Sequence, residues 1–321
     1  MRKTPILSIC IPTFNRCNFL DACLKSIVSQ FKNEYMHGMI EVIISDNASS
    51  DNTQRVVKKF QKKYKNIRYY RNNKNIKAQN LIKVGLYAKG KYIWFFSDDD
   101  LHYSDSIQSV IEVLRNHKPD AITCNTDLFS KDMTSLVDSN LLRMVGGDRI
   151  FKTKKELFHY LESKVSLPFD WYVGVMSNTI ISRDLFKNNL PIIHKKFGNL
   201  EETLVFFYPS FIYYNPSNYK VFFFQKPQLK FRADNRSFGL SKKNTFLPYW
   251  HSVLGKHYDD ICKINKRNVS LRFIFLIWLK KMTRISRVFF LNLFNFDIAH
   301  ILMVLFYKDS KGKRKKWQIS V

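Results

Sequence analysis

The feature that most constrains this chain is an alternation of strand-like and helical patterns over its first 120 residues. The strand-like runs read ILSICI, IEVIIS, IRYY and YIWFFS, and helical patterns follow at 19–31, at 52–64, up to residue 89, and at 104–117. Strands that alternate with helices form mostly parallel sheets with helices on both faces. The sequence therefore predicts an α/β fold with a doubly wound, mostly parallel sheet.

Polar residues follow three of these strands at the point where each strand ends. The first strand is followed by PTFN, the second by DNASSDNT and the fourth by DDD. In such sheets ligands bind outside the carboxyl ends of the strands. We therefore expect these polar groups to converge on one edge of the sheet.

The triplet Asp98 to Asp100 is unusual because three adjacent like charges repel one another. They can all remain ionised if a cation shares them or if water reaches them freely. Carboxylate oxygens suit Mg²⁺ or Mn²⁺, which take their remaining ligands from water and substrate phosphates. The triplet is thus interpreted as a clamp for a metal and a diphosphate, and the alternative is a solvated loop that caps the helix beginning near Ser104.

Asp46 directly follows the second strand and could accept a hydrogen bond from a ring N–H of a nucleotide base. The alternative is an acidic turn in which Ser49, Ser50 or Asp51 caps the next helix. For these three residues capping is the favoured interpretation, whereas for Asp46 it is ligand binding.

The length of 321 residues exceeds the roughly 250 to 300 at which a single core stops growing, so a main domain with an appendage is expected. We predict a catalytic domain over 1–245, with a nucleotide-binding half at 1–117 and an acceptor half at 118–245. A basic, helical, membrane-associated region is predicted over 246–321.

The net charge of +27, from 53 Lys and Arg against 26 Asp and Glu, favours anionic partners. Residues 256–321 hold fifteen basic and four acidic residues, a net +11, with apolar residues at helical spacing from Trp278 to Leu293. These amphipathic helices are predicted to lie on an anionic membrane surface rather than cross it, because Asp297 and other polar residues interrupt the apolar run. The alternative is that they pack on the catalytic domain as ordinary core.

The cysteines and the amino terminus indicate the compartment. Five cysteines without CxxC spacing support neither a disulfide framework nor a zinc site, and the start MRKTPILSICIP lacks the pattern of a signal peptide. We expect a cytoplasmic protein, peripheral on the inner face of the cell membrane.

The segments LSICIPTFNRCNFLDACLKSIVSQ, IEVIISDNASSDNT, AKGKYIWFFSDDDL and EETL occur in the order found in family 2 glycosyltransferases with a GT-A fold, which the chain resembles. The likeness is strong from residue 6 to about 117 and weaker to about 240. Within the family the first hundred residues are most similar to the abequosyltransferase-like O-antigen enzymes. The resemblance implies transfer of a sugar from a nucleotide-diphosphate sugar to a saccharide acceptor, usually with inversion and with a divalent cation, in the synthesis of a bacterial surface polysaccharide such as O-antigen or capsule.

The resemblance also assigns roles to individual residues. Pro12, Thr13 and Asn15 match the loop that lines the nucleotide pocket. Asp46 matches the acid that reads the base, and Asp98 with Asp99 matches the ribose and metal contacts. Asp100 falls where many members have no acid, so the choice of metal ligands among the three aspartates stays open.

The family places its general base in a Glu-Asp pair that opens a helix in the second half. Here LEETL offers Glu201 and Glu202, with Glu202 in the place of the Asp. Glu202 is the first candidate and Glu201 the second. The alternative is that these acids simply favour the amino end of a helix through its dipole.

Three basic residues are weaker candidates near the site. Lys77 stands where the family commonly has the glycine of Asn-x-Gly, and it is interpreted as solvated, although it could reach a phosphate. Arg232 and Arg236 could neutralise the departing diphosphate, because the guanidinium group matches phosphate geometry.

Two other classes of protein remain as alternatives. A sugar-1-phosphate nucleotidyltransferase would share the nucleotide-binding topology, but no glycine-rich loop follows the first strand. A nucleic-acid-binding protein would explain the basic charge but not the acidic edge, so we expect no nucleic-acid partner. The motifs GxGxxG, GxxxxGK[ST] and GxSxG are absent, which disfavours dinucleotide redox enzymes, P-loop NTPases and α/β-hydrolases.

Overall fold

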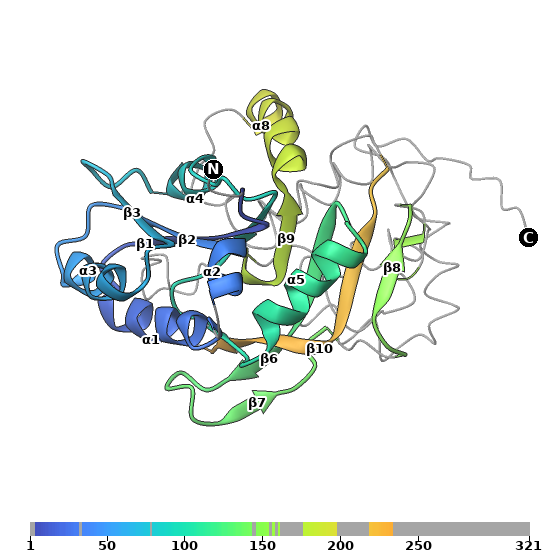
Figure 1. The fold of residues 1–321 in the computed structure, drawn as a ribbon, viewed down its shortest axis with the longest axis horizontal. Helices are drawn as coiled ribbons and strands as arrows, with labels where there is room; N and C mark the ends of the chain where they lie inside the picture. The colour runs from blue at the N-terminus through green and yellow to red at the C-terminus, as the bar shows by residue number, and fades with distance from the viewer. Residues whose placement is uncertain are drawn as a thin grey trace, which may run out of the picture. The chain divides into compact units, whose positions relative to one another are not determined.

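The structure is a computed structural model that describes residues 4–31, 34–77, 79–142, 146–153, 156–157, 160, 176–197 and 218–233. Figure 1 shows these residues in colour and the rest of the chain as a grey trace. The helices and strands described below all belong to one compact unit, made of residues 1–157 and 166–239.

Four parallel strands form the first half of one large sheet. They are β1 (Leu7–Thr13), β2 (Ile40–Asp46), β3 (Ile67–Arg71) and β4 (Tyr92–Phe95). Their order across the sheet is β3-β2-β1-β4, and every neighbouring pair is parallel. The predicted α/β class and the parallel character of this half are confirmed.

The sheet continues beyond β4 in the order β9-β6-β10-β5, where β5 directly follows the aspartate triplet and the other three strands come from the second half of the unit. These strands are β5 (Leu101–His102), β6 (Ala121–Phe129), β9 (Thr179–Ser182) and β10 (Val221–Arg232). Strand β9 is antiparallel to both β4 and β6, whereas β10 is parallel to β6. Two short strands, β7 (Leu136–Asp138) and β8 (Arg149–Phe151), pair with β6 and β10. The second half is therefore mixed.

Helices cover both faces of the sheet (Figure 1). They are α1 (Cys17–Val28), α2 (Glu34–Met39), α3 (Thr53–Lys63), α4 (Gln79–Leu86), α5 (Ser106–Asn116) and α8 (Arg183–Phe197), with a short 3₁₀ turn η1 (Met176–Asn178) before β9. In the figure α4 lies above β1 and β2, and α1 and α3 lie below them. This is the doubly wound arrangement that the sequence predicts.

Side chains that alternate along β4 pack against helices on both faces of the sheet. Trp94 and the following Phe96 belong to a core cluster that includes apolar residues of α1, α3 and α5. Phe95 points to the other face, where its ring lies 5.5 Å from that of Phe186 in α8. All three side chains are fully buried, so the strand that leads into the aspartates is fixed on both faces.

A buried carboxylate joins the parallel strands at their amino ends. Glu41, near the start of β2, accepts hydrogen bonds from Ser8 Oγ at 2.6 Å and from the backbone N–H groups of Lys89 at 2.6 Å and Gly90 at 3.1 Å. Its second oxygen pairs with Arg68 at 2.7 Å. A Cβ at Gly90 would lie 2.6 Å from Ser8 Oγ and 2.8 Å from Ser8 N, so this close packing requires glycine. Glu41 thus connects β1, β2, β3 and the approach to β4.

Over the first 117 residues the predicted elements agree with the structure to within a few residues. The sequence did not indicate the short α2 and β5, nor the individual strands and helix after residue 117. Within the described ranges no helix combines the length and apolar character needed to cross a membrane. The predicted boundary at 245 and the helical region 246–321 lie outside the described residues and stay predictions.

Candidate active site

The carboxyl ends of β1, β2 and β4 bring their polar residues to one edge of the sheet. Thr13 at the end of β1 is in register with Asp46 at the end of β2. The hydroxyl of Thr13 also donates to Asp98 Oδ2 at 2.7 Å, and Asp98 lies in the loop that follows β4. The edge that the sequence predicts is therefore assembled from strands that are distant along the chain.

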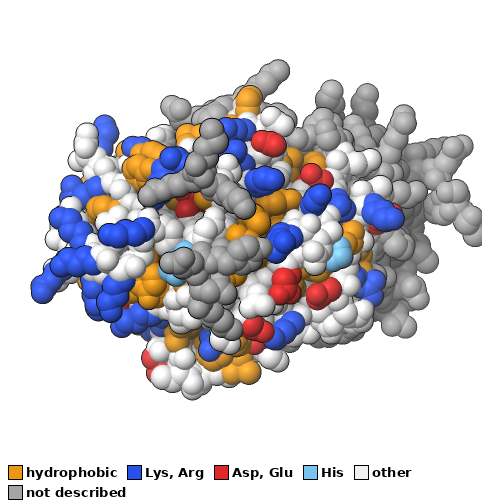
Figure 2. Space-filling model, viewed as in Figure 1, with side chains coloured by type: hydrophobic (Ala, Val, Ile, Leu, Met, Phe, Trp, Pro, Cys, Tyr) orange, Lys and Arg blue, Asp and Glu red, His pale blue; other side chains and the backbone are white. Residues whose placement is uncertain are grey.

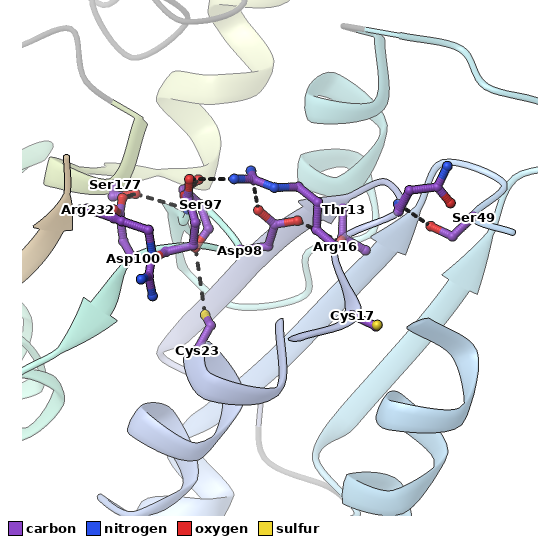
Figure 3. A network of polar contacts seen from close by, with 12 residues as sticks. Thr13, Arg16, Cys17, Cys23, Ser49, Ser97, Asp98, Asp100, Ser177 and Arg232 are labelled. Atoms are coloured by element: carbon purple, nitrogen blue, oxygen red, sulfur yellow. Dashed lines mark hydrogen bonds and ion pairs between the residues drawn. The ribbon is translucent and has the colours of Figure 1, made fainter. Parts of the chain in front are cut away.

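Arg16 joins the first two aspartates of the triplet. Figure 3 shows its contact with Asp98. Its two terminal nitrogens lie 2.8 Å from Asp98 Oδ1 and 2.8 Å from Asp99 Oδ2. Ser97 Oγ donates to the other oxygen of Asp99. Both carboxylates are nearly inaccessible, since the residues are 3% and 5% exposed.

Asp100 faces the second half of the unit. Ser177 Oγ donates to Asp100 Oδ2 at 2.6 Å, and the backbone N–H of Arg232 donates to Oδ1 at 3.2 Å. The guanidinium of Arg232 donates instead to the carbonyl oxygens of Asp99 and Lys131. The triplet lies in the loop after β4, and Asp100 is held there by the turn before β9 and by the end of β10 (Figure 3).

The pKa values of two aspartates reflect this crowding. Burial raises the pKa of Asp98 to about 7; Arg16 opposes this rise and the charge of Asp99 adds to it. Burial also raises the pKa of Asp100 well above its usual range, and the charges of Asp99 and Asp98 contribute. Burial and mutual repulsion thus disfavour ionisation of these two carboxyl groups, and a cation bound beside them would favour it.

The aspartate carboxylates supply only some of the ligands that a divalent cation needs. Among the residues that the structure describes, no three His, Cys, Asp or Glu side chains form a group that could hold a metal ion. Mg²⁺, however, commonly binds through one or two carboxylates and completes its shell with water and substrate phosphates. The adjacent carboxylates of Asp98 and Asp99 offer oxygens of that kind, so a cation shared with a bound diphosphate is compatible with this edge.

Asp46, the predicted base-reading acid, is fully buried at the end of β2. Its Oδ1 accepts from the backbone N–H of Ser49 at 2.8 Å, and its Oδ2 accepts from the hydroxyl of Tyr69 at 2.5 Å. Burial and this hydrogen bond raise the pKa of Tyr69. Arg71 lies 3.6 Å from the same carboxylate. Asp46 is therefore a rigid part of the edge, and its contact with a base stays a prediction.

The loop after β1, which carries Asn15, is fastened to the loop after β2. Asn15 has a positive φ of 52°. Its backbone N–H donates to Ser49 Oγ at 2.9 Å, and its side-chain oxygen accepts from the backbone N–H of Ser50 at 2.7 Å. Pro12 precedes this loop inside β1 and pairs with Ser45. The predicted nucleotide loop thus has a fixed shape.

Asp51 caps two helices at once. Its Oδ1 accepts from the backbone N–H of Thr53, the first residue of α3, at 3.0 Å. Its Oδ2 accepts from the backbone N–H of Cys17, the first residue of α1, at 2.9 Å. The N-cap residue of α3 is Asn52, and Ser49 and Ser50 contact Asn15 instead of the helix. Of the three predicted capping residues, Asp51 bonds to the first residue of α3, and it further ties the two loops together.

The departure at Lys77 has a structural counterpart. Lys77 adopts a positive φ of 51°, the conformation that glycine adopts most readily, and its residue is exposed. Its carbonyl oxygen accepts from Asn47 Nδ2 at 3.2 Å, and Asn47 Oδ1 accepts from Asn72 at 3.1 Å and from the backbone N–H of Ile76 at 2.9 Å. Buried asparagine side chains hold this loop, so a glycine is not needed to form it.

Sequence reasoning missed Arg16 and Ser177, which both contact the triplet. Arg16 could have been noticed because it directly follows the polar loop after the first strand. Ser177 lies 77 residues from Asp100 and carried no local signal. Glu201, Glu202 and Arg236 lie outside the described residues.

Comparison with known proteins adds relatives along the same part of the chain. The abequosyltransferase RfbV of Salmonella typhimurium is 26% identical over 181 residues, which are 56% of this chain and 53% of that protein. The GalNAc(5)-diNAcBac-PP-undecaprenol beta-1,3-glucosyltransferase of Campylobacter jejuni is 37% identical over 111 residues, or 34% of each protein. The chain thus matches about half the length of the first relative and about a third of the second.

Solved structures show the same fold. TarS residues 1–349 of S. aureus, in complex with UDP-GlcNAc, superpose with a TM-score of 0.58 at 14% identity, covering 95% of this chain and 77% of that one. The mannosyltransferase PcManGT from Pyrobaculum calidifontis, in complex with GDP-Man and Mn²⁺, gives a TM-score of 0.50 at 13% identity, covering 94% and 75%. The predicted GT-A-type fold is confirmed.

The sequence profile of the family described as Glycosyl transferase family 2 matches residues 8–190. That range contains β1 to β4 with their polar ends, the aspartate triplet and Ser177. It covers more than half of the chain, so the chain belongs to glycosyl transferase family 2.

Proposed function

We propose that this protein transfers a sugar from a nucleotide-diphosphate sugar to a hydroxyl group of a saccharide acceptor. One observation carries the proposal: three buried carboxylates stand at the carboxyl edge of a parallel sheet in a member of this family. Ligands of such sheets bind at that edge. Two structural neighbours are described in complex with nucleotide sugars, UDP-GlcNAc and GDP-Man.

The chemistry assigns separate tasks to the residues. Cleavage of the anomeric C–O bond leaves negative charge on the departing diphosphate, and a bound Mg²⁺ or Mn²⁺ would neutralise it there. Asp98 and Asp99, with Asp100 as the third candidate, would hold that cation, and Thr13 orients Asp98 through its hydroxyl. Asp46 would face the nucleotide base from the adjacent strand.

The acceptor hydroxyl must lose a proton as the new bond forms. We assign this task to Glu202, with Glu201 as the alternative, and propose a single displacement that inverts the anomeric centre. A general base contributes about 10² to 10⁴-fold to the rate. Glu202→Gln should therefore lower kcat within that range with little change in donor affinity. If Glu201→Gln has this effect and Glu202→Gln does not, the assignment moves by one residue.

We further propose that the acceptor is linked to a lipid and that the product belongs to a bacterial surface polysaccharide. The names of the relatives mention abequosyl transfer and a PP-undecaprenol acceptor. The basic region 246–321 would hold the protein on the inner face of the cell membrane. The described unit is also basic on one side: Figure 2 shows Lys and Arg gathered over the part where α3 lies, and the exposed side chains there are Arg55, Lys58, Lys59, Lys62 and Lys63.

The proposed function can be tested by measuring thermal melting of the purified full chain with a panel of nucleotide sugars, with and without Mn²⁺. At least one nucleotide sugar should raise Tm in the presence of Mn²⁺, because a ligand that binds the folded state stabilises it. That donor is then incubated with lipid-linked saccharides, and the products are identified by mass spectrometry. If no donor stabilises the protein and none is consumed, the proposal is wrong.

A further inference from the structure

Arg16 occupies the position between the two carboxylates that are the first candidates for the cation. It contacts Asp98 Oδ1, as Figure 3 shows, at 2.8 Å. It also contacts Asp99 Oδ2 at 2.8 Å, so one guanidinium fork spans two residues. Arginine forms such paired contacts because its donors have fixed geometry. These two oxygens are therefore already engaged by Arg16, in residues that are only 3% and 5% exposed.

The side chain of Arg16 is held in place rather than free to move in solvent. Arg16 immediately precedes α1, and its carbonyl oxygen accepts from the backbone N–H of Leu20 at 3.0 Å. Its guanidinium lies 5.0 Å from the centre of the Phe19 ring, and its side chain is only 15% exposed. Contact with an aromatic ring in a partly buried site stabilises the cation at this position.

Arg232 provides an internal comparison because it lies beside the same ring, 4.9 Å from its centre. Its guanidinium, however, donates to the carbonyl oxygens of Asp99 and Lys131 and not to the carboxylate pair. Arg232 therefore fixes the backbone of the triplet, whereas Arg16 places a positive charge directly on its carboxylate oxygens.

Resting on the proposed function, we propose that Arg16 and the divalent cation compete for Asp98 Oδ1 and Asp99 Oδ2, so that Arg16 limits the affinity of the site for the cation alone. A divalent ion that binds these oxygens must displace the guanidinium, or must share the oxygens with it although the two positive charges repel each other. In either case Arg16 weakens binding of the bare ion. A diphosphate would relieve this opposition, since its oxygens can accept from a displaced guanidinium. Arg16 is in this account a positioning residue that couples cation binding to donor binding.

The test is a titration of the full chain with Mn²⁺ alone, in which electron paramagnetic resonance measures the concentration of the free ion. Arg16→Gln should bind Mn²⁺ on the order of tenfold more tightly than the unaltered protein, because a positive charge within a few ångströms of the ion is removed. Arg55→Gln is the control: it removes the same charge from the exposed side of α3 and should leave the affinity unchanged. Equal or weaker binding by Arg16→Gln would overturn the proposal, since a purely structural role predicts a damaged site.

Arg16→Lys provides a second variant in case the glutamine variant does not fold, which thermal melting will show. Lysine keeps the charge but cannot span both carboxylates, so Mn²⁺ affinity should lie between those of the other two proteins. If Arg16→Lys binds no more tightly than the unaltered chain, or if no protein in the set binds Mn²⁺, the competition is rejected. The titration involves no sugar transfer, so a failure of the proposed function would appear separately, as absence of donor consumption.

Discussion

Buried carboxylates stand at both edges of the parallel half of the sheet, in contrasting surroundings. At the amino edge Glu41 accepts from a hydroxyl, two backbone N–H groups and Arg68. At the carboxyl edge Asp98, Asp99 and Asp100 lie together, and burial and mutual repulsion raise the pKa of the first and the last. The comparison suggests a criterion for function: a single buried acid surrounded by protein donors holds the fold together, whereas a group of adjacent buried acids whose ionisation is disfavoured marks a place for an outside cation.

The largest effect is expected at the carboxyl edge. Asp99→Ala should reduce sugar transfer by about 100-fold or more, because it removes a cation ligand. The free energy of unfolding should hold or rise, since one of three crowded charges is lost. Transfer assays with Mn²⁺ and urea unfolding measure the two quantities. Asp132→Ala, in an exposed turn, is the control for charge, and undiminished transfer by Asp99→Ala would remove its proposed role.

The opposite result is expected at the amino edge. Glu41→Ala should lower the free energy of unfolding by about 3 kcal/mol, because Arg68 loses its ion pair and the backbone N–H of Lys89 loses its acceptor, while the N–H of Gly90 keeps Ser8 Oγ as its partner. Transfer by the fraction that remains folded should be unchanged at low temperature. Urea unfolding checks the first statement. A variant with normal stability and reduced transfer would reverse the distinction between the edges.

Gly90→Ala should act on the same edge with a smaller effect of about 2 kcal/mol. The added Cβ would lie 2.8 Å from Ser8 N and 2.9 Å from the carbonyl carbon of Leu7, and backbone atoms in a paired strand yield little. Gly38→Ala is a matched control, because its Cβ would meet nothing within 4 Å. If both variants melt alike, the close packing at the amino edge is not a source of stability.

The pH dependence of stability should report on the carboxyl edge in the metal-free protein. The pKa of Asp98 is raised from 3.8 to about 7 in the folded state, so between about pH 4 and 7 the folded protein binds more protons than the unfolded chain. The contribution of Asp98 to stability is therefore present at low pH and is lost as pH rises toward 7. Urea unfolding of chelator-treated protein should show this loss, and Asp98→Asn should reduce it. Identical pH profiles for the two proteins would contradict the assignment.

The smallest expected effect concerns backbone conformation beside the site. Ala48 adopts a φ of 67°, which costs an L-residue free energy that glycine avoids. Ala48→Gly should stabilise the protein by about 0.5 kcal/mol after the greater entropy of glycine in the unfolded chain is included. Thermal melting measures the change. A clear loss of stability would show that the alanine side chain makes contacts that outweigh the strain.

The elements of the first half could be predicted from sequence because each strand is a short apolar run that ends abruptly in polar residues. The position of Asp98 to Asp100 at the carboxyl edge follows from that same pattern. The partners of these acids could not be predicted, because Arg16 is 82 residues and Ser177 is 77 residues away from the aspartates they contact. Glu41 was missed for a similar reason: its role depends on donors from three separate segments that meet only in the folded sheet.

The central claim, that the crowded edge binds the cation and the donor diphosphate, is tested most directly by diffraction from crystals grown with Mn²⁺ and a nucleoside diphosphate. Data collected at the manganese absorption edge locate the ion independently of the protein coordinates. The account predicts an anomalous peak within coordination distance, roughly 2 Å, of an Asp98, Asp99 or Asp100 carboxylate oxygen, in contact with the diphosphate. A diphosphate bound elsewhere, or an ion that contacts none of these three carboxylates, would contradict it.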